Sequence, residues 1–425
     1  MSATGSGAAG NARPSPVMRA RALQGLVREH ADAADRERHL PAAVARAFAA
    51  AGLYRIGAPA ACGGEAADPM TQIDTIETIA EADGSAGWNL MIGVETFGLI
   101  APGLGRCPEL IADPEVVMCS STAAVGRADA VSGGYRINGQ WQFVSGCHNS
   151  DVFGATVRLY RDGAPVPDRG NVYAMIERGD FEILDTWHVS GLRGSGSHDV
   201  RVADVFVPES RIIPPIGGDN RLSTGSSGAA IPGAARLAAA SDAAGADAQR
   251  EHALLRFPLG ARLAYNKVAV ALGIARAALT AFTGLATGKV PRFSSTSLRE
   301  RGAAQRAVAV AAVRTNGARA LVHDEVAQLW RAVCAGERPS ARQLALFQAS
   351  CSQAVADACS AVDLLADAAG TTANSIGHPL ERLSRDVRVV RQHATVASHH
   401  LDDAGRVLLG LPGQGLMLRG LEASD

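Results

Sequence analysis

The sequence predicts a mainly helical α+β protein in which a β-rich region lies between two helical regions. Apolar residues recur at helical spacing over residues 16–115, short runs alternate polar and apolar residues over 116–215, and helical spacing returns over 251–425. Because strands and helices do not alternate along the chain, a parallel, doubly wound sheet is disfavoured. We therefore expect an N-terminal helical domain, a central antiparallel β-domain and a C-terminal four-helix bundle with those bounds.

The N-terminal region begins with small, polar residues. Residues 1–15 lack the apolar run of a signal peptide and are expected to form a disordered tail. The spacing of apolar residues then predicts helices over 17–37, 40–53, 70–83 and 84–101. Pro41 and Gly52 fit the start and the end of the second helix. The last of these helices is apolar on nearly every side, so we expect it to be buried.

The central region reads as hairpins of short strands. Runs with period-two alternation, rich in Val, Phe, Tyr and Ile, are punctuated by Gly, Asp and Asn at 133–146, 171–184 and 198–211. Residues 216–250 that follow are low in complexity and chemically plain. We expect them to form a flexible insertion, either a disordered segment tolerated by the fold or, as the alternative, a mobile lid.

The C-terminal region has four long stretches with an apolar stripe, at 259–287, 298–333, 340–370 and 381–409. Gly370 fits a C-cap at the end of the third stretch. Four helices of this length predict an antiparallel bundle.

The composition excludes several classes of function. The chain has 41 Lys and Arg residues against 42 Asp and Glu residues, for a net charge of -1, and its aromatic content is 4%. No general positive field is available to hold nucleic acid or an anionic membrane, and aromatic residues for base stacking are few. No apolar run reaches the length of about 18 residues that a membrane span needs. We expect neither nucleic acid nor membrane as a partner.

Seven cysteines, an odd number, are scattered without a CxxC pair. A disulfide framework is not expected, and a reducing cytoplasm is the expected location. No group of His, Cys, Asp and Glu has metal-ligand spacing along the chain, so no metal site is expected. The glycine fingerprint for dinucleotides, the P-loop and the GxSxG elbow of hydrolases do not occur in their required contexts.

Three sequence strings carry a resemblance to a known family. They are NGQWQFVSGCHNSD at 138–151, SGLRGSGSHDVRVADVFVP at 190–208 and HPLERLSRDVRV at 378–389. In this order they resemble the two flavin-side strands and the start of the last long helix of the acyl-CoA dehydrogenase superfamily. The resemblance covers about residues 20 to 410. It implies a barrel-like β-domain between helical domains, and a homotetramer whose flavin site is completed across subunits.

The dehydrogenases of this family need a carboxylate base, and the sequence lacks it where the family places it. Counting from Asp386, the position of the Glu is Ala394, and the alternative family position near Leu263 offers no carboxylate either. The pattern resembles instead the two-component flavin-dependent monooxygenases. That branch takes reduced FMN or FAD from a separate NAD(P)H-dependent flavin reductase, binds O2, forms a flavin hydroperoxide and oxygenates a small substrate. The resemblance points to an aromatic or nitrogen-containing substrate.

The resemblance assigns roles to individual residues. His393, beside the missing Glu and on the predicted last helix, would activate the substrate; a neutral imidazole suits that task at neutral pH. Ser145 would hydrogen-bond the flavin, with Ser120 or Ser121 as a second hydroxyl and Phe143 packing on the ring from the same strand face. Further cofactor contacts would come from Trp187, Arg193, Ser195, Ser197, Arg292 and Ser375.

Glu95 departs from this branch, which often carries a His at that place in the buried helix. Its carboxylate would bind a cationic substrate, act as a base or form a structural salt bridge, since a buried carboxylate needs a partner. If it acts as a base, the protein is an FAD dehydrogenase or oxidase of the same fold. A catalytically silent family member is the other alternative.

Overall fold

The computed structural model describes residues 13–167, 170–214, 253–415, 417–419 and 421. Most of the tail predicted at 1–15, and the insertion predicted at 216–250, lie outside these residues. The N-terminal helices are α1 (Pro16–Glu37), α2 (Ala42–Ala50), α3 (Pro69–Ala80) and α4 (Gly84–Leu104). Pro41 is the N-cap of α2, and Gly52, with a φ of 68°, follows the C-cap of that helix.

The central region is a single eight-stranded sheet. Its main strands are β1 (Met118–Val131), β2 (Gly134–Val144), β3 (Val152–Arg161), β5 (Asn171–Glu177) and β7 (His198–Pro208), and the short ones are β4 (Ala164–Pro165), β6 (Glu182–Leu184) and β8 (Ile212–Ile213). The order across the sheet is β6-β7-β2-β1-β3-β5-β8, with β4 paired to β3.

One strand pair departs from the antiparallel expectation. β1 and β3 run parallel, whereas every other paired strand is antiparallel. The hairpin β1–β2 places β2 on one side of β1, and the chain then crosses to the other side to add β3 in the direction of β1. Hairpin signals alone could not predict this crossing.

The C-terminal helices are α7 (Leu259–Gly288), α8 (Gly302–Cys334), α9 (Ala341–Ala369), α10 (Pro379–Arg391) and α11 (His399–Leu408). Gly370 caps α9 with a φ of 64°, which confirms the predicted C-cap. The single helix predicted over 381–409 is wrong, because residues 392–398 form a turn between α10 and α11. This break places His393 in a turn rather than on a helix.

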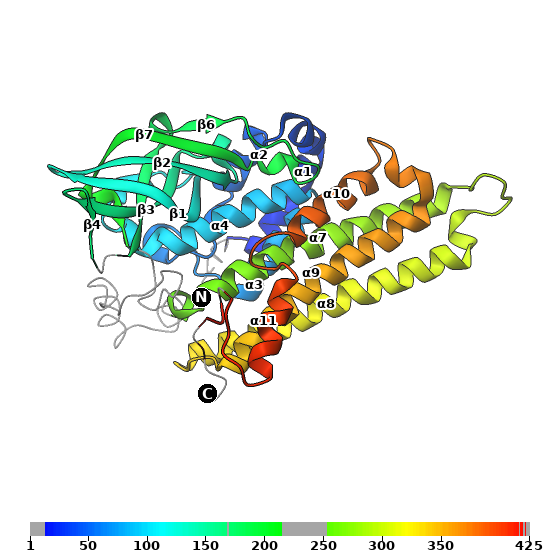
Figure 1. Ribbon diagram of the computed structural model, residues 1–425. Coiled ribbons are helices and arrows are strands. Elements are labelled where there is room, and N and C mark those ends of the chain that lie inside the picture. The colour runs from blue at the N-terminus through cyan, green and yellow to red at the C-terminus, as the bar shows by residue number, and fades with distance from the viewer. Residues whose placement is uncertain (1–12, 168–169, 215–252, 416, 420, 422–425) are drawn as a thin grey trace, which may run out of the picture.

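The layers explain how a site can form where the domains meet. One apolar core joins the N-terminal helices to the bundle, and a second lies within the sheet. In Figure 1 the sheet lies against α4, and the bundle extends from α4 and α7 toward the opposite side of the molecule. Because α4 contacts both β1 and α7, its side chains reach the sheet and the bundle at once.

α7 is long and apolar enough to span a membrane by length and composition. The core helix of a globular domain passes the same test, and 56% of the apolar window is buried within the described structure. Arg262 and Lys267 are among its buried residues. We interpret α7 as the central helix of the bundle.

Candidate active site

The end of β2 is distorted where the first expected flavin contacts lie. The pairing of β2 with β7 shifts between Trp141 and Val144, and Phe143 has a left-handed φ of 58°. The predicted common face of Phe143 and Ser145 is therefore wrong, since the bulge breaks the alternation. Phe143 is 69% exposed, with its ring 6.1 Å from the largely buried ring of Trp187, whereas Ser145 is 5% exposed.

Three serine hydroxyls form a buried hydrogen-bonded chain beside this bulge. Ser197 Oγ lies 2.7 Å from Ser145 Oγ and 2.7 Å from Ser195 Oγ. Trp88 of α4 donates from Nε1 to Ser145 Oγ at 3.0 Å. The predicted residues of the two flavin-side strings therefore meet. Ser197 bonds both Ser145 and Ser195, so these hydroxyls contact one another in the structure.

The loop that carries Ser195 and Ser197 is fixed by α10. Asp386 accepts the Leu192 N–H at 2.6 Å, and Leu192 has a left-handed φ of 49°. A Cβ at Gly191 would lie 2.3 Å from the carbonyl oxygen of Arg385, and one at Gly194 would lie 2.7 Å from the Cβ of Ala34. These glycines allow close packing against α10 and α1.

Arg193 is engaged by the protein rather than presented to a ligand. Its Nε donates to the Asp35 carbonyl at 2.8 Å, and its Nη1 donates to Val189 O at 3.2 Å. An ion pair with the Asp35 carboxylate spans 3.7 Å. In the structure Arg193 thus joins the loop to α1.

His393 is far from the serines along the chain, but it packs on Trp88, whose indole also donates to Ser145. The two ring centroids are 5.4 Å apart. Thr395 holds Nδ1, with its Oγ1 at 3.0 Å and its backbone N–H at 3.3 Å. Within the described residues, Nε2 is therefore the nitrogen left to face a ligand. Burial and the charge of Lys267 lower the pKa of His393 to about 3, so the imidazole is neutral at neutral pH.

Glu95 forms a buried ion pair, the structural interpretation among the three given above. Lys267 Nζ donates to both carboxylate oxygens at 2.6 Å, and Asn266 Nδ2 donates to one of them at 3.2 Å. Burial raises the pKa of Glu95 and lowers that of Lys267, while each charge opposes the shift of the other. Lys267 Nζ lies over the Trp88 ring, 6.0 Å from its centroid, so the ion pair is next to the indole.

The second pair of candidate hydroxyls belongs to β1. Ser120 Oγ lies 2.9 Å from the hydroxyl of Thr96 on α4. Ser121 is 9% exposed, and its Oγ accepts from the Ala123 N–H at 3.3 Å. Ser120 thus joins the sheet to α4 at the residue next to Glu95, whereas Ser121 forms its hydrogen bond within its own strand.

Arg292 and Ser375 lie away from the serine chain. The α7–α8 connection that carries Arg292 is at the end of the bundle remote from the sheet (Figure 1). Lys289 Nζ ties this connection to the segment before α10 by donating to Ala369 O and Thr372 Oγ1, both at 2.6 Å. Arg292 and Ser375 are exposed, as are the large side chains beside them, Phe293 and Ile376, each at 96%.

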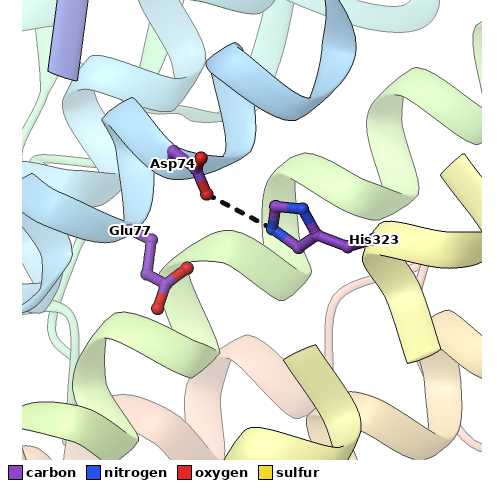
Figure 2. A group of neighbouring side chains, drawn as sticks. All are labelled: Asp74, Glu77 and His323. Carbon is purple, nitrogen blue, oxygen red and sulfur yellow. Dashed lines mark ion pairs between the residues drawn. The ribbon is translucent and has the colours of Figure 1, made fainter. Parts of the chain in front are cut away.

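A different group has the composition of a metal site, although spacing along the chain gave no sign of it. Figure 2 shows Asp74 and Glu77 of α3 facing His323 of α8. His323 Nε2 lies 3.3 Å from Asp74 Oδ1. Arg319 bonds both carboxylates, and Arg276 donates to Glu77 at 3.0 Å. Two guanidinium groups already neutralise the acids, so we interpret the group as an ion network that joins α3 to the bundle.

Sequence reasoning missed three residues of the site: Trp88, Lys267 and Thr395. Trp88 lies in the stretch 84–101 that was predicted to be a buried helix, and this position was a usable signal. Lys267 is one of only two lysines among 41 basic residues, and it falls in an apolar stretch. Such a cation needs a buried counter-charge, and Glu95 was the unpaired candidate. Nothing in the sequence marked Thr395.

Comparison with known proteins places the chain in a family. The family model described as acyl-CoA dehydrogenase, N-terminal domain, matches residues 18–102, and that described as acyl-CoA dehydrogenase, C-terminal domain, matches 265–398. An indole-3-acetate monooxygenase of Pseudomonas putida is 30% identical over 89% of this chain and 90% of its own length. The oxygenase subunit HsaA of a flavin-dependent monooxygenase of Rhodococcus jostii is 30% identical over 89% and 94%.

Solved structures agree with this placement. The crystal structure of 3-HSA hydroxylase from Rhodococcus sp. RHA1 superposes with a TM-score of 0.79 at 27% identity, covering 95% of this chain and 99% of the other. The predicted fold class and the predicted monooxygenase branch are therefore confirmed.

The donor set fits a reduced flavin. An exposed aromatic ring, Phe143, stands beside Trp187 and offers a planar apolar wall. Next to it the Ser145 hydroxyl accepts from Trp88 and can give its hydrogen either to Ser197 or to a ring nitrogen. A flat heteroaromatic ring with acceptor atoms is the ligand that such a wall and donor suit.

Proposed function

The chain belongs to the acyl-CoA dehydrogenase family, in its flavin-dependent monooxygenase branch, and on that premise we propose that it hydroxylates a phenol or an indole, with His393 facing the substrate. The reduced flavin comes from a separate reductase, for which NAD(P)H is the expected electron source. When bound, the reduced flavin supplies the two electrons with which O2 is split between the substrate and water. The relative named for indole-3-acetate supports an electron-rich aromatic substrate.

One observation carries this proposal: the described residues offer a neutral imidazole, His393, beside the position where the dehydrogenases carry their carboxylate base. Ala394 and Leu263 occupy the positions of the dehydrogenase base. Glu95, the buried carboxylate on α4, has both oxygens bonded to Lys267. Removal of a proton beside a thioester carbonyl therefore lacks the carboxylate that the dehydrogenases use, whereas a phenol or indole can be activated by a hydrogen bond.

We propose that His393 activates the substrate through Nε2, as the acceptor of a hydrogen bond from the substrate O–H or N–H. In the tautomer that allows this, Nδ1–H donates to Thr395 Oγ1 at 3.0 Å, and Thr395 Oγ1 donates to the Leu263 carbonyl at 3.3 Å. Thr395 then orients the ring as the third group of a relay does. The Thr395 N–H contact to Nδ1 requires the other tautomer, so the nitrogen chemical shifts of the His393 ring distinguish the two.

In this proposal Ser145 and Phe143 hold the flavin. Ser120 of β1, which is bonded to Thr96 of α4, supplies a second hydroxyl. Ser121, Trp187 and Arg193 support the walls of the site through contacts with the protein itself. The apolar rings of Trp88, Trp187 and Phe143 exclude water from the reacting atoms, which protects the reduced oxygen species from release as peroxide.

Arg292 and Ser375 are proposed to bind the flavin phosphates of a neighbouring subunit in a homotetramer. Their loops carry three exposed apolar side chains, Val290, Phe293 and Ile376, at 56%, 96% and 96%. Exposed apolar groups beside a cation are typical of an interface that another chain covers. We also propose a cytoplasmic location.

The test is incorporation of labelled oxygen. The protein is mixed with reduced FMN or reduced FAD, 18O2 and, in turn, a panel of phenols and indoles. We expect one 18O atom in each molecule of hydroxylated product, dependent on the protein. Reduced flavin that reoxidises in the presence of protein as it does alone, with no product from any member of the panel, would contradict the function. Turnover of acyl thioesters would favour the dehydrogenase instead.

A further inference from the structure

The hydrogen bonds among Ser145, Ser195 and Ser197 determine which hydroxyl hydrogen is left to donate to a ligand. A serine hydroxyl has one hydrogen to donate and two lone pairs with which to accept. Trp88 Nε1 can only donate, so its 3.0 Å bond uses one lone pair of Ser145. What the remaining groups do depends on the direction in which the chain of hydroxyls runs.

Three arrangements are possible, because Ser197 has one hydrogen to donate and two lone pairs with which to accept. If Ser197 accepts from both neighbours, its own hydrogen has no acceptor among the described residues, and Ser197 is 4% exposed. If Ser145 donates to Ser197 and Ser197 to Ser195, the last hydrogen is left on Ser195, which is 1% exposed. In the described part of the chain, Ser197 Oγ is the hydrogen-bond partner of Ser195 Oγ, so that hydrogen has no acceptor. A buried donor without an acceptor is costly. If the chain runs from Ser195 to Ser197 to Ser145, both inner hydrogens are used, and the one left over is on Ser145, two residues from the exposed ring of Phe143, where a ligand can accept it.

In the favoured direction the Ser145 oxygen receives two hydrogen bonds, from Trp88 and from Ser197. Both lone pairs are then occupied, and its own hydrogen is the one that remains to be donated. We propose that Ser197, supported by Ser195 and Trp88, is a positioning residue that turns the Ser145 hydroxyl hydrogen outward, toward a flavin nitrogen. This inference rests on the proposed function, and it places Ser195 and Ser197 behind Ser145 rather than on the cofactor.

The backbone keeps the oxygens at these distances. Val144 of β2 pairs with His198 of β7, and the Gly146 N–H donates to Ser195 O at 3.0 Å. From α4, Asn89 Nδ2 donates to Gly194 O at 3.1 Å. The ends of β2 and β7 are thus joined to each other and to α4, so the hydroxyl chain is set before a ligand arrives.

A double-mutant cycle tests the inference on the full chain. Ser145→Ala, Ser197→Ala and the double variant are titrated anaerobically with reduced FMN and with reduced FAD, and the dissociation constants are measured. Ser350→Ala, which removes another buried hydroxyl from α9, is the matched control. Thermal unfolding of each variant verifies that it folds. Trp88→Phe removes the indole N–H, keeps a ring, and serves as a second test.

We expect Ser145→Ala to weaken reduced-flavin binding about tenfold and Ser197→Ala about threefold to fivefold, the scale of single hydrogen bonds. The double variant should bind no more weakly than Ser145→Ala, because Ser197 acts only through Ser145. Trp88→Phe should weaken binding in the wild-type background and leave the affinity of Ser145→Ala unchanged.

Other results overturn the inference in ways that can be told apart. If the two effects multiply in the double variant, Ser197 contacts the flavin directly. If Ser145→Ala weakens binding and Ser197→Ala does not, the direction of the chain is wrong. In both cases the proposed function stands. If Ser145→Ala leaves the affinity for both flavins unchanged, the flavin does not bind at Ser145, and the proposed site fails together with the inference.

Discussion

The three bonded serines and the end of the bundle that carries Arg292 are both expected to contact flavin. The serines are buried within one subunit, whereas the end of the bundle is exposed. Ser145, Ser195 and Ser197 are buried and bonded to partners from α4, β2 and β7. At the bundle end, Arg292 lies over the ring of Phe293, and Phe293 and Ile376 are almost fully exposed. The first region is organised within one chain, whereas the second presents charge and apolar surface outward. Substitutions should therefore act locally in the first and through assembly in the second.

The largest effect should come from the ion pair behind Trp88. Lys267→Met leaves the Glu95 carboxylate buried without its cation, and we expect a loss of about 3–5 kcal/mol in the free energy of unfolding. The double variant Glu95→Gln with Lys267→Met should recover most of it, because no charge is then left unpaired. Urea unfolding of the three proteins measures the difference. A loss below about 1 kcal/mol in Lys267→Met would show that the pair is solvated.

Next in size is the effect of His393→Ala on turnover. Loss of a positioned hydrogen-bond acceptor should lower the rate of product formation about 100-fold, with reduced-flavin affinity changed less than about twofold. His399→Ala, an exposed histidine on the adjoining α11, is the control. Measured rates with saturating reduced flavin decide the matter. An equal fall in flavin affinity would place His393 on the cofactor instead of the substrate.

At the bundle end we expect intermediate effects that depend on assembly. Phe293→Ser should shift the protein toward smaller species in sedimentation velocity, and Arg292→Ala should weaken reduced-flavin binding about tenfold without changing the species present. Arg306→Ala, another exposed arginine, is the control. If Phe293→Ser changes neither sedimentation nor flavin affinity, this end of the bundle is not an interface, and the contrast between the two regions loses its basis.

The smallest effect concerns acid stability. Burial, with His39 and His198 nearby, lowers the pKa of His148 to about 4, so the unfolded chain takes up the proton first as the pH falls. The native state should therefore lose stability between about pH 6.5 and pH 4, by much less than the limit of about 1.4 kcal/mol per pH unit, because His148 is only half-buried and solvent screens its charge. His148→Gln should flatten that slope. His378, at the bundle end, has a pKa lowered by burial and by Lys289, and His378→Gln should flatten the slope less. Urea midpoints at three pH values compare them, and equal slopes in all three proteins would refute the assignment.

Much of the fold was predictable because local signals and tertiary structure agree. The helices α1 to α4 and α7 to α9 follow the apolar spacing, and Gly370 marks a helix end as expected. The break at 392–398 was not predictable, because the stretch contains neither Gly nor Pro. Contacts from distant residues produce it: Gln348 donates to Thr395 O at 2.9 Å, and His400 donates to Ala394 O at 2.6 Å.

The candidate site was predictable in part. Family strings drew attention to Ser145, Ser195 and Ser197, but not to their bonds with one another, because those bonds depend on the register of β2 with β7. The partner of Glu95 lies on α7, far along the chain, so only the fold could identify it. Alternation predicted one face for Phe143 and Ser145, and the bulge at the strand end separated them.

The turn between α10 and α11 has a consequence for how this enzyme lineage can diverge. An insertion within a continuous helix rotates everything that follows by about 100° per residue, which would disrupt bundle packing. Residues 392–398 separate two helices that are each packed on α9, so the length and composition of this turn can change while the bundle keeps its register. With His393 facing the substrate as proposed, mutation of this short segment would sample new substrates without changing the scaffold, which makes it a target for directed evolution.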